Sequence, residues 1–347
     1  MLYKQFLVNK EKKNAYVIAE IGNNHQGSIE LAFKMVDKAI ECGVSAVKFQ
    51  RRNNKDLFTN EFFNKPYDNP NSFGDVYGTH RQALELNLDE LSKLKDYTES
   101  KSCDFLVTPF DIKSLEELEK ISCQFYKVAS ADIVHTPMIN KMIRTNKPII
   151  MSTGHSNYSD IDRAVEILDK SDISYALLHC TASYPTRIED MNLSAITTMF
   201  KRYPNAINIG LSDHENGIDC ASIAYMLGAR IFEKHFTLNR SFKGTDNVFS
   251  LEPSGMRKLV RNLRRIPVSL GSSDHNILEA EKKPVYKMRK SIVYKQNYNQ
   301  GSVIGIDDLE FRCPGDGLEP YHLDLVIGRT LKLSVKEHQC VEMSHLG

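Results

Sequence analysis

The sequence lacks the features that mark membrane and secreted proteins. No apolar run approaches the roughly 20 residues that a membrane-spanning helix needs. The first residues, MLYKQFLVNKEKKN, contain no apolar stretch long enough for a signal peptide. We therefore expect a cytoplasmic protein that has no membrane as a partner.

The chain also lacks an excess of charge of either sign. Its 45 Lys and Arg residues oppose 44 Asp and Glu residues, which leaves a formal charge of +1 over 347 residues. A nucleic-acid-binding protein usually carries a clear positive excess, so we expect no nucleic acid as a partner. Any site for an anion must be local.

Paired cysteines are missing as well. The seven cysteines are scattered, odd in number and without a CxxC pair, which is typical of reduced thiols rather than of a disulfide framework or a zinc site. Several lie in apolar runs, such as Cys180 in LLHCTASYP, where a core position is expected.

What the sequence does contain is a repeated alternation of two patterns. Eight short apolar runs are typical of buried parallel strands. They cover residues 15–22, 44–50, 104–110, 125–130, 148–153, 175–180, 207–212 and 230–236. Amphipathic segments with helical spacing separate them, for example SIELAFKMVDKAIECG, in which Leu31, Met35 and Ala39 share one face.

Eight such units predict a closed (β/α)₈ TIM barrel over residues 1–270. A doubly wound open sheet is the alternative, but no G-x-G-x-x-G follows the first strand. Residues 271–287 are predicted as a linker. Residues 288–347 are predicted as a small, mostly β domain, with strand candidates SIVYK, LEFRCP and LVIGRTLKLSV.

A long insertion, residues 51–86, follows the second strand. It is rich in aromatic and charged residues. Loops of this length in a compact domain are usually functional, so we expect it to contribute to the site.

Polar side chains gather at the carboxyl ends of the predicted strands, where a barrel of this kind carries its active site. Lys48 and Lys127 lie within apolar runs, so each needs an anionic partner to offset the cost of leaving water. Hydroxyl side chains at other strand ends belong to Thr108, Ser130, Ser152 and Ser212. Together they suit a phosphate and a carboxylate, although ion pairs and bonds to loop amides would explain single members.

Two histidines, His214 and His235, end the neighbouring strands seven and eight. Two imidazoles without a cysteine suit a divalent ion such as Mn, Fe, Co or Zn that acts as a Lewis acid. His25, His80 and His179 are weaker candidates.

Five carboxylates complete the polar set: Glu20, Asp132, Asp213, Glu233 and Asp246. Glu20 could form a salt bridge with Lys48 or act as a base and binder of substrate hydroxyls. Asp246 lies in a glycine-containing loop after strand eight, where an ordinary turn role competes with a role at the site.

A series of motifs resembles a known family. The motifs, in the family's order, are AEIGNNHQG, VKFQ, TPFD, YKVASAD, STG, HCTASYPT, GLSDH, EKHFT, KGTDNVFSLEP and RCPGDGLEP. They resemble the sialic acid synthase family, the phosphoenolpyruvate-dependent nonulosonate synthases, over essentially the whole chain. The C-terminal part resembles the family's antifreeze-like (SAF) domain.

The resemblance implies condensation of phosphoenolpyruvate with the open-chain aldehyde of an N-acylated hexosamine. It implies that His214 and His235 hold a divalent metal, with Mn²⁺ first and Mg²⁺ or Co²⁺ as alternatives. It implies a phosphoenolpyruvate site formed by Lys48, Thr108, Lys127, Ser130, Ser152 and Ser212. It implies a sugar site formed by Glu20, Asn71, Asp132, Tyr184, Glu233, Asp246 and Arg312. Asp213 is then expected to orient Ser212 or His214.

Arg312, in RCPGDG, matches an arginine that the family's tail inserts into the partner subunit's barrel. The resemblance thus implies a domain-swapped homodimer. The chain departs from the family pattern at Ala131 and Asp132, where many members have Gly and Glu or Asp, and at Ala182, where some have Asn.

The sugar is less closely defined. Free N-acetylmannosamine is the first expectation, and the alternatives are its 6-phosphate, which gives a 9-phosphate product, and the legionaminate or pseudaminate precursors. Charged loop residues that could meet a sugar phosphate are His80, Arg81, Arg240 and Lys243. A metal-dependent sugar aldolase or isomerase and a non-catalytic sugar-binding barrel are the alternatives from other classes.

Overall fold

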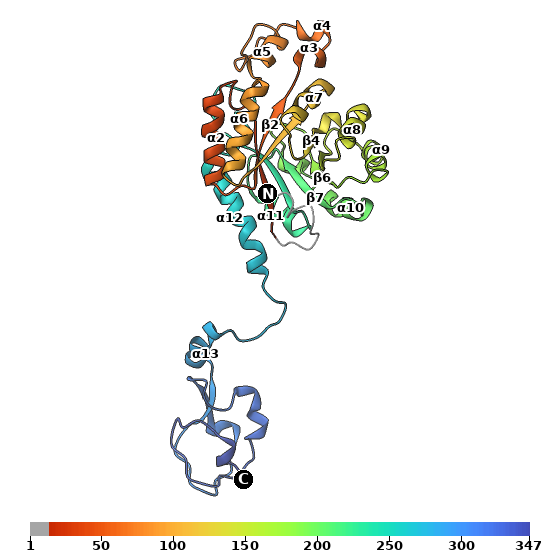
Figure 1. Ribbon diagram of the computed structural model, residues 1–347. Helices are drawn as coiled ribbons and strands as arrows, with labels where there is room; N and C mark the ends of the chain where they lie inside the picture. Colours follow the sequence, from red (N-terminus) through yellow and green to blue (C-terminus); the bar gives the residue numbers. More distant parts are fainter. Residues whose placement is uncertain (1–13) are drawn as a thin grey trace. The chain divides into compact units, whose positions relative to one another are not determined.

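The computed structural model describes residues 14–347, and the predicted absence of a signal peptide concerns residues 1–13, which lie outside that range. The chain divides into two compact units, one ending at Gly271 and one running from Ser272 to Gly347 (Figure 1). Across residues 14–347, no helix has both the length and the apolar character that crossing a bilayer would require.

The first unit contains a closed barrel of eight parallel strands, and the predicted TIM barrel is confirmed. The strands are β1 (Tyr16–Gly22), β2 (Ala46–Arg51), β3 (Asp104–Pro109), β4 (Tyr126–Val128), β5 (Ile149–Ser152), β6 (Tyr175–Cys180), β7 (Asn208–Asp213) and β8 (Ile231–His235). The barrel closes because β1 pairs with both β2 and β8. Each predicted apolar run coincides with one of these strands, and β2 and β7 each extend one residue beyond the predicted run.

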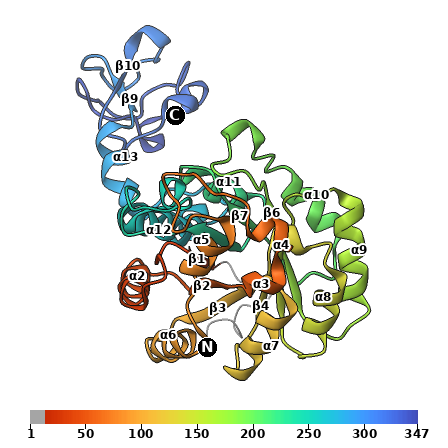
Figure 2. The same ribbon diagram turned by 90° about the horizontal axis from the view of Figure 1, so that it is seen from above.

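Helices surround the strands (Figure 2). They are α2 (Ile29–Glu41), α6 (Leu88–Ser100), α7 (Ile112–Lys120), α8 (Thr136–Ile143), α9 (Tyr158–Asp169), α10 (Ala195–Arg202), α11 (Asp219–Met226) and α12 (Pro253–Leu270). Short 3₁₀ turns are η1 (Ser130–Asp132), η2 (Ile188–Asp190) and η3 (Asn247–Phe249). Helix α2 begins where the Ser28 side chain accepts a hydrogen bond from the backbone N–H of Leu31 and so caps the helix.

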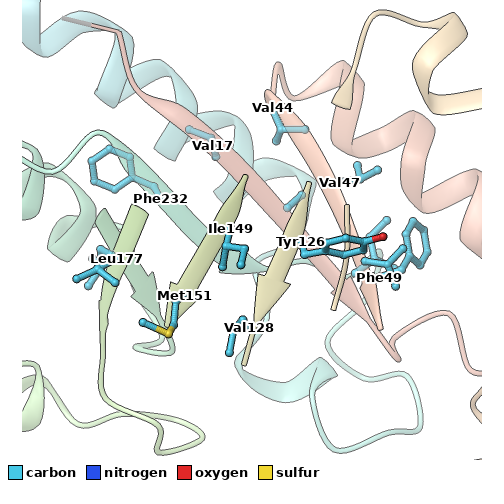
Figure 3. Close-up of a cluster of buried hydrophobic side chains, with 14 of the residues drawn as sticks. Val17, Val44, Val47, Phe49, Tyr126, Val128, Ile149, Met151, Leu177 and Phe232 are labelled. Atoms are coloured by element: carbon cyan, nitrogen blue, oxygen red, sulfur yellow. The ribbon is translucent and has the colours of Figure 1, made fainter. Parts of the chain in front are cut away.

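The main hydrophobic core lies between the strands and the helices (Figure 3). Alternate strand residues, such as Val47 and Phe49 in β2 and Tyr126 and Val128 in β4, point toward the helices. Burial of each such side chain contributes roughly 1.5–3 kcal/mol. The intervening residues therefore face the barrel interior, where a smaller apolar cluster includes Ile18.

The insertion after β2 forms three short helices that the sequence did not predict. They are α3 (Asn54–Leu57), α4 (Asn60–Phe63) and α5 (Tyr77–Ala83). Their aromatic rings pack on one another, with Phe62 and Tyr77 centroids 4.8 Å apart and Tyr67 and His80 centroids 4.6 Å apart. This packing holds α5 in a defined position.

The second unit begins with η4 (Glu279–Glu281) and α13 (Lys282–Met288), so the segment predicted as a linker carries helical structure. Strands β9 (Ser291–Tyr294) and β10 (Leu309–Arg312) form an antiparallel pair. Three further 3₁₀ turns follow, η5 (Ile306–Asp308), η6 (Pro320–Leu325) and η7 (Met343–His345). The third strand candidate, 325–335, is wrong, because its Thr330, Leu331 and Val335 bridge three different partners and build no ladder.

Candidate functional site

Alternate residues of each strand face the barrel interior, and near the carboxyl ends of the strands these interior residues are polar. In β1 the interior positions are Ile18 and then Glu20, and in β2 they are Ala46 and then Lys48. The same step from apolar to polar leads from Ile150 to Ser152 in β5. Each of these strands thus fills the barrel interior with an apolar side chain and carries a polar side chain two residues closer to its carboxyl end.

These groups surround one cavity of about 230 Å³. It is lined by Glu20, Asn23, Lys48, Gln50, Arg52, Arg81, Thr108, Phe110, Lys127, Ala129, Ser130, Ala131, Ser152, His155, Tyr184, Ser212, His214, Glu233, His235 and Asp246. Every residue predicted for the phosphoenolpyruvate and metal sites is in this set. The sequence therefore predicted that these eight side chains line one cavity, and their roles in binding stay predictions.

The two lysines share a buried network with two carboxylates. Lys48 Nζ lies 2.7 Å from Glu20 Oε2 and 3.6 Å from Glu233 Oε1, and Lys127 Nζ lies 4.0 Å from Glu233 Oε2. Lys48 also donates to the Thr108 hydroxyl at 3.1 Å, and Lys127 donates to Ser152 at 2.6 Å. The ion pair between Glu20 and Lys48 that the sequence allowed is present.

The network shifts the two lysines in opposite directions. Burial acts to lower the pKa of Lys48, but Glu20 and Glu233 outweigh it and the pKa is raised. Burial lowers the pKa of Lys127, since Glu233 opposes that effect only in part and Lys48 adds to it. Burial acts to raise the pKa of Glu233, yet the two lysines leave it lowered. Lys48 and Lys127, each beside a buried carboxylate, form the cationic floor of the cavity.

His214 and His235 lie side by side with ring centroids 5.4 Å apart. Burial, together with the charge of His235, lowers the pKa of His214 to about 3, so its ring is neutral. Its Nδ1 lies 3.1 Å from the Thr181 carbonyl, which favours the tautomer that donates there and keeps a lone pair on Nε2. His235 Nδ1 is buried without a hydrogen bond, 3.8 Å from Asp246 Oδ2.

Two imidazoles placed in this way fit a divalent metal as two of its ligands. No cluster of three or more His, Cys, Asp or Glu side chains with metal-binding spacing occurs among residues 14–347. A metal held by His214 and His235 would therefore take its other ligands from water or substrate, which is the open coordination that Lewis-acid chemistry requires.

Tyr184 and Asp246 stand at the mouth of the cavity. The Tyr184 ring lies 4.3 Å from that of His214, and the side chain is 53% exposed. Burial of its hydroxyl end and nearby acidic groups raise the pKa of Tyr184, so the phenol stays protonated and can donate.

Three predicted sugar-site residues do not line the cavity. Asp132, in η1, is partly buried, and its Oδ2 has no hydrogen-bond partner. Asn71 accepts a hydrogen bond from the backbone N–H of Gly244 at 3.1 Å. Arg312 belongs to the second unit, where it lies 2.6 Å from Glu310 Oε2. Their roles at the sugar stay predictions.

The expectation that Asp213 orients Ser212 or His214 was wrong. Asp213 faces the helices and pairs with Lys234 at 2.8 Å, while its other oxygen accepts from the Glu215 N–H. It contacts neither Ser212 nor His214 because neighbouring strand residues point to opposite faces. Lys234 is thus a further buried lysine in a strand, and its role is structural; the sequence analysis did not single it out.

The weaker histidine candidates also lie outside the cavity. His179 bonds to the Met191 carbonyl at 2.8 Å, and His25 and His80 accept from backbone N–H groups of Gly27 and Phe73. Among the charged loop residues, Arg81 lines the cavity, whereas Lys243 and Arg240 do not. The residue that sequence reasoning missed is Arg52, and its place on the same face as Lys48 and Gln50 was the available signal.

A TIM barrel whose cavity brings together lysines, arginines, hydroxyl groups and two imidazoles has the features of an enzyme that acts on small anionic substrates. The model of the NeuB family matches residues 35–275, and that of the SAF domain matches residues 289–347. The chain belongs to the NeuB family and is a sialic acid synthase-type enzyme, a phosphoenolpyruvate-dependent condensing synthase.

Its relatives make different sugar acids. The chain is 32% identical to the N-acetylneuraminate-9-phosphate synthase of Homo sapiens, over 94% of this chain and 91% of the relative. It is 31% identical to the N,N'-diacetyllegionaminic acid synthase of Campylobacter jejuni, over 95% and 99%. The crystal structure of N-acetylneuraminic acid synthetase from Leptospira borgpetersenii superposes with a TM-score of 0.67 at 33% identity, over 78% and 90%.

Proposed function

We propose that this enzyme condenses phosphoenolpyruvate with the open-chain form of an N-acylmannosamine-type sugar, N-acetylmannosamine or its 6-phosphate, to give a nine-carbon 2-keto-3-deoxy sugar acid and phosphate. The observation that carries the proposal is the cavity in which two buried lysines and several hydroxyls lie beside the imidazoles of His214 and His235. One half suits an anion and the other suits an aldehyde on a metal.

Phosphoenolpyruvate would occupy the cationic floor. Its phosphate and carboxylate would bind Lys48, Thr108, Lys127, Ser130, Ser152 and Ser212. Because these donors are already held by Glu20, Glu233 and the barrel, they stabilise charge on the departing phosphate without reorganising. No covalent nucleophile is needed.

His214 and His235 would hold the divalent metal, for which Mn²⁺ is the first choice and Mg²⁺ or Co²⁺ are alternatives. When bound, the metal supplies Lewis-acid polarisation of the sugar aldehyde. Tyr184, Asp246 and Glu20 would orient the sugar hydroxyls, Glu20 being fixed by a 2.6 Å hydrogen bond from Gln50.

In the reaction, the double-bond electrons of phosphoenolpyruvate form a bond from its carbon 3 to the aldehyde carbon, and the electrons of the aldehyde C=O π bond move to its oxygen, which takes up a proton. Carbon 2 is left electron-poor, and water adds there and loses a proton. Cleavage of the bond between carbon 2 and the phosphate oxygen then releases phosphate, and loss of the second water proton leaves a ketone at carbon 2. Lys48 and Lys127 stabilise negative charge throughout, and Glu20 would accept or deliver a proton at the sugar.

The proposal includes a cytosolic, domain-swapped homodimer in which Arg312 of one subunit completes the sugar site of the other. The family resemblance supports this arrangement. Without the partner's arginine, the sugar would lose a contact at its N-acyl group.

The test is release of phosphate from phosphoenolpyruvate with Mn²⁺, with N-acetylmannosamine, its 6-phosphate and diacetamido sugars offered separately and the products weighed by mass spectrometry. The expected product combines both substrates, and Lys48→Met is the inactive control. Sugar cleavage or isomerisation without phosphoenolpyruvate would instead support a metal-dependent aldolase or isomerase. Legionaminate-type product from the diacetamido sugar alone would replace the proposed substrate.

A further inference from the structure

Two arginines line the cavity away from its lysine floor. Along β2, the residues Lys48 and Gln50 point into the barrel, and Arg52 follows just beyond the end of the strand. Four extended residues span up to about 13 Å, so Arg52 lies well outward from Lys48. Arg81 approaches the same wall from α5 in the insertion.

The Arg52 side chain is held in place, but not all of its N–H donors have a hydrogen-bond partner. Its side chain is 7% exposed, its guanidinium stacks 3.7 Å above the Phe110 ring, and its Nη2 donates to Gln50 Oε1 at 2.6 Å. Its Nη1 lies 3.7 Å from Glu85 Oε1 and has no hydrogen bond. Burial, reinforced by the positive charge of Arg81, lowers the pKa of Arg52 to about 10, which leaves it charged at neutral pH.

Arg81 has still fewer partners. Its Nε is buried without a hydrogen bond, and within residues 14–347 its side chain forms no ion pair. Glu85, which lies beside Arg52, is shared with Arg51, whose Nη1 is 3.9 Å from Glu85 Oε2. Two like charges therefore meet at a cavity wall with unused donors, an arrangement that costs free energy unless an anion occupies it.

We propose that Arg52 and Arg81 bind a phosphate monoester carried by the sugar, so that the preferred substrate is a 6-phosphorylated N-acylmannosamine rather than the free sugar. The inference rests on the proposed function. Guanidinium groups present paired N–H donors that match phosphate oxygens, and Arg52 is already oriented by Gln50 and Phe110.

The phosphate of phosphoenolpyruvate is the other source of the same chemistry. Lys48 and Lys127, with the hydroxyls bonded to them, already provide a complete anion site deeper in the barrel. Arg52 follows the outer end of the strand that carries Lys48, and Arg81 lines the same cavity from α5. An anion bound by them would thus be a second one.

The experiment compares kcat/KM for the 6-phosphorylated and the free sugar in wild-type enzyme and in Arg81→Gln. Arg81 lies on the insertion, so its change disturbs the barrel less than a change at buried Arg52. The ratio of phosphorylated to free sugar should fall about tenfold to a hundredfold in Arg81→Gln, as expected for loss of a charge-assisted hydrogen bond. Lys243→Gln removes one exposed positive charge outside the cavity and should keep the wild-type ratio.

An unchanged ratio in Arg81→Gln would overturn the proposal, and so would a raised KM for phosphoenolpyruvate with the ratio unchanged. If wild-type enzyme releases no phosphate with any sugar, the proposed function fails separately. Calorimetric titration of the sugar 6-phosphate then decides the inference. Weaker binding to Arg81→Gln than to Lys243→Gln would support it, and equal binding would refute it.

Discussion

Ionisation of Asp132 is expected to lower the free energy of unfolding, because its carboxylate is largely buried. It lies in η1 after β4, its Oδ2 has no hydrogen-bond partner, and burial raises its pKa from 3.8 to about 7 despite the opposing charges of Arg52 and Lys127. We predict that Asp132→Asn stabilises the barrel at alkaline pH. The amide keeps the shape of the side chain and has no charge to bury.

The size of the effect follows from linkage. Between pH 4 and pH 7 the unfolded carboxyl ionises while the folded one stays protonated, so the folded state binds more protons and its stability falls as pH rises. Three pH units at 1.36 kcal/mol each give about 4 kcal/mol, and partial exposure reduces this to about 2–4 kcal/mol. The variant should therefore match wild type near pH 4 and gain its full advantage above pH 7.

The assay is guanidinium denaturation of both proteins at intervals from pH 4.5 to pH 8.5, with Asp172→Asn as the control because that carboxylate lies exposed in a loop. The reasoning would be refuted if Asp132→Asn were no more stable than wild type at pH 8. An equal gain at every pH would also refute it, since that result would indicate a hydrogen bond made by the amide rather than removal of a buried charge.

Three further predictions concern the site. His214→Ala should lower Mn²⁺ affinity at least about tenfold by calorimetry, whereas His179→Ala, which loses only its bond to a backbone carbonyl, should leave that affinity unchanged; equal losses would contradict the ligand assignment. Lys48→Met should abolish phosphate release and destabilise the protein by about 3–5 kcal/mol in denaturant titrations, because Glu20 loses its buried partner. Arg312→Ala chains mixed with Lys48→Met chains and refolded together should regain activity if Arg312 acts across subunits; no recovery would mean that it acts within its own chain or not at all.

The sequence sufficed for the barrel because buried parallel strands and amphipathic helices each leave a strong periodic pattern. It also identified Lys48, Lys127, His214 and His235, since polar residues inside apolar runs are conspicuous. These patterns are local in the sequence, so they can be recognised without the three-dimensional structure.

What the sequence could not supply depends on contacts between distant segments. Arg52 looked like one more charge in a charged loop, and only the fold brings it beside Arg81 and Phe110. Lys234 went unnoticed because its neighbour His235 drew the functional interpretation. The orientation of Asp213 could have been predicted from the sequence. Because Ser212 faces the barrel interior, its strand neighbour Asp213 must face the helices, where it pairs with Lys234.

The alternation of faces along the strands has a consequence for how this molecule can vary. Deleting one residue within β8 would turn Glu233 and His235 toward the helices and bring Phe232 and Lys234 into the cavity. Insertion or deletion of a single residue within a strand is thus not tolerated, while residues can be added to or removed from the segment between β2 and α6 at little cost in stability. If Arg81 binds the sugar phosphate as proposed, sugar preference can change through this segment, which carries α5, while the strand-end residues of the barrel stay the same.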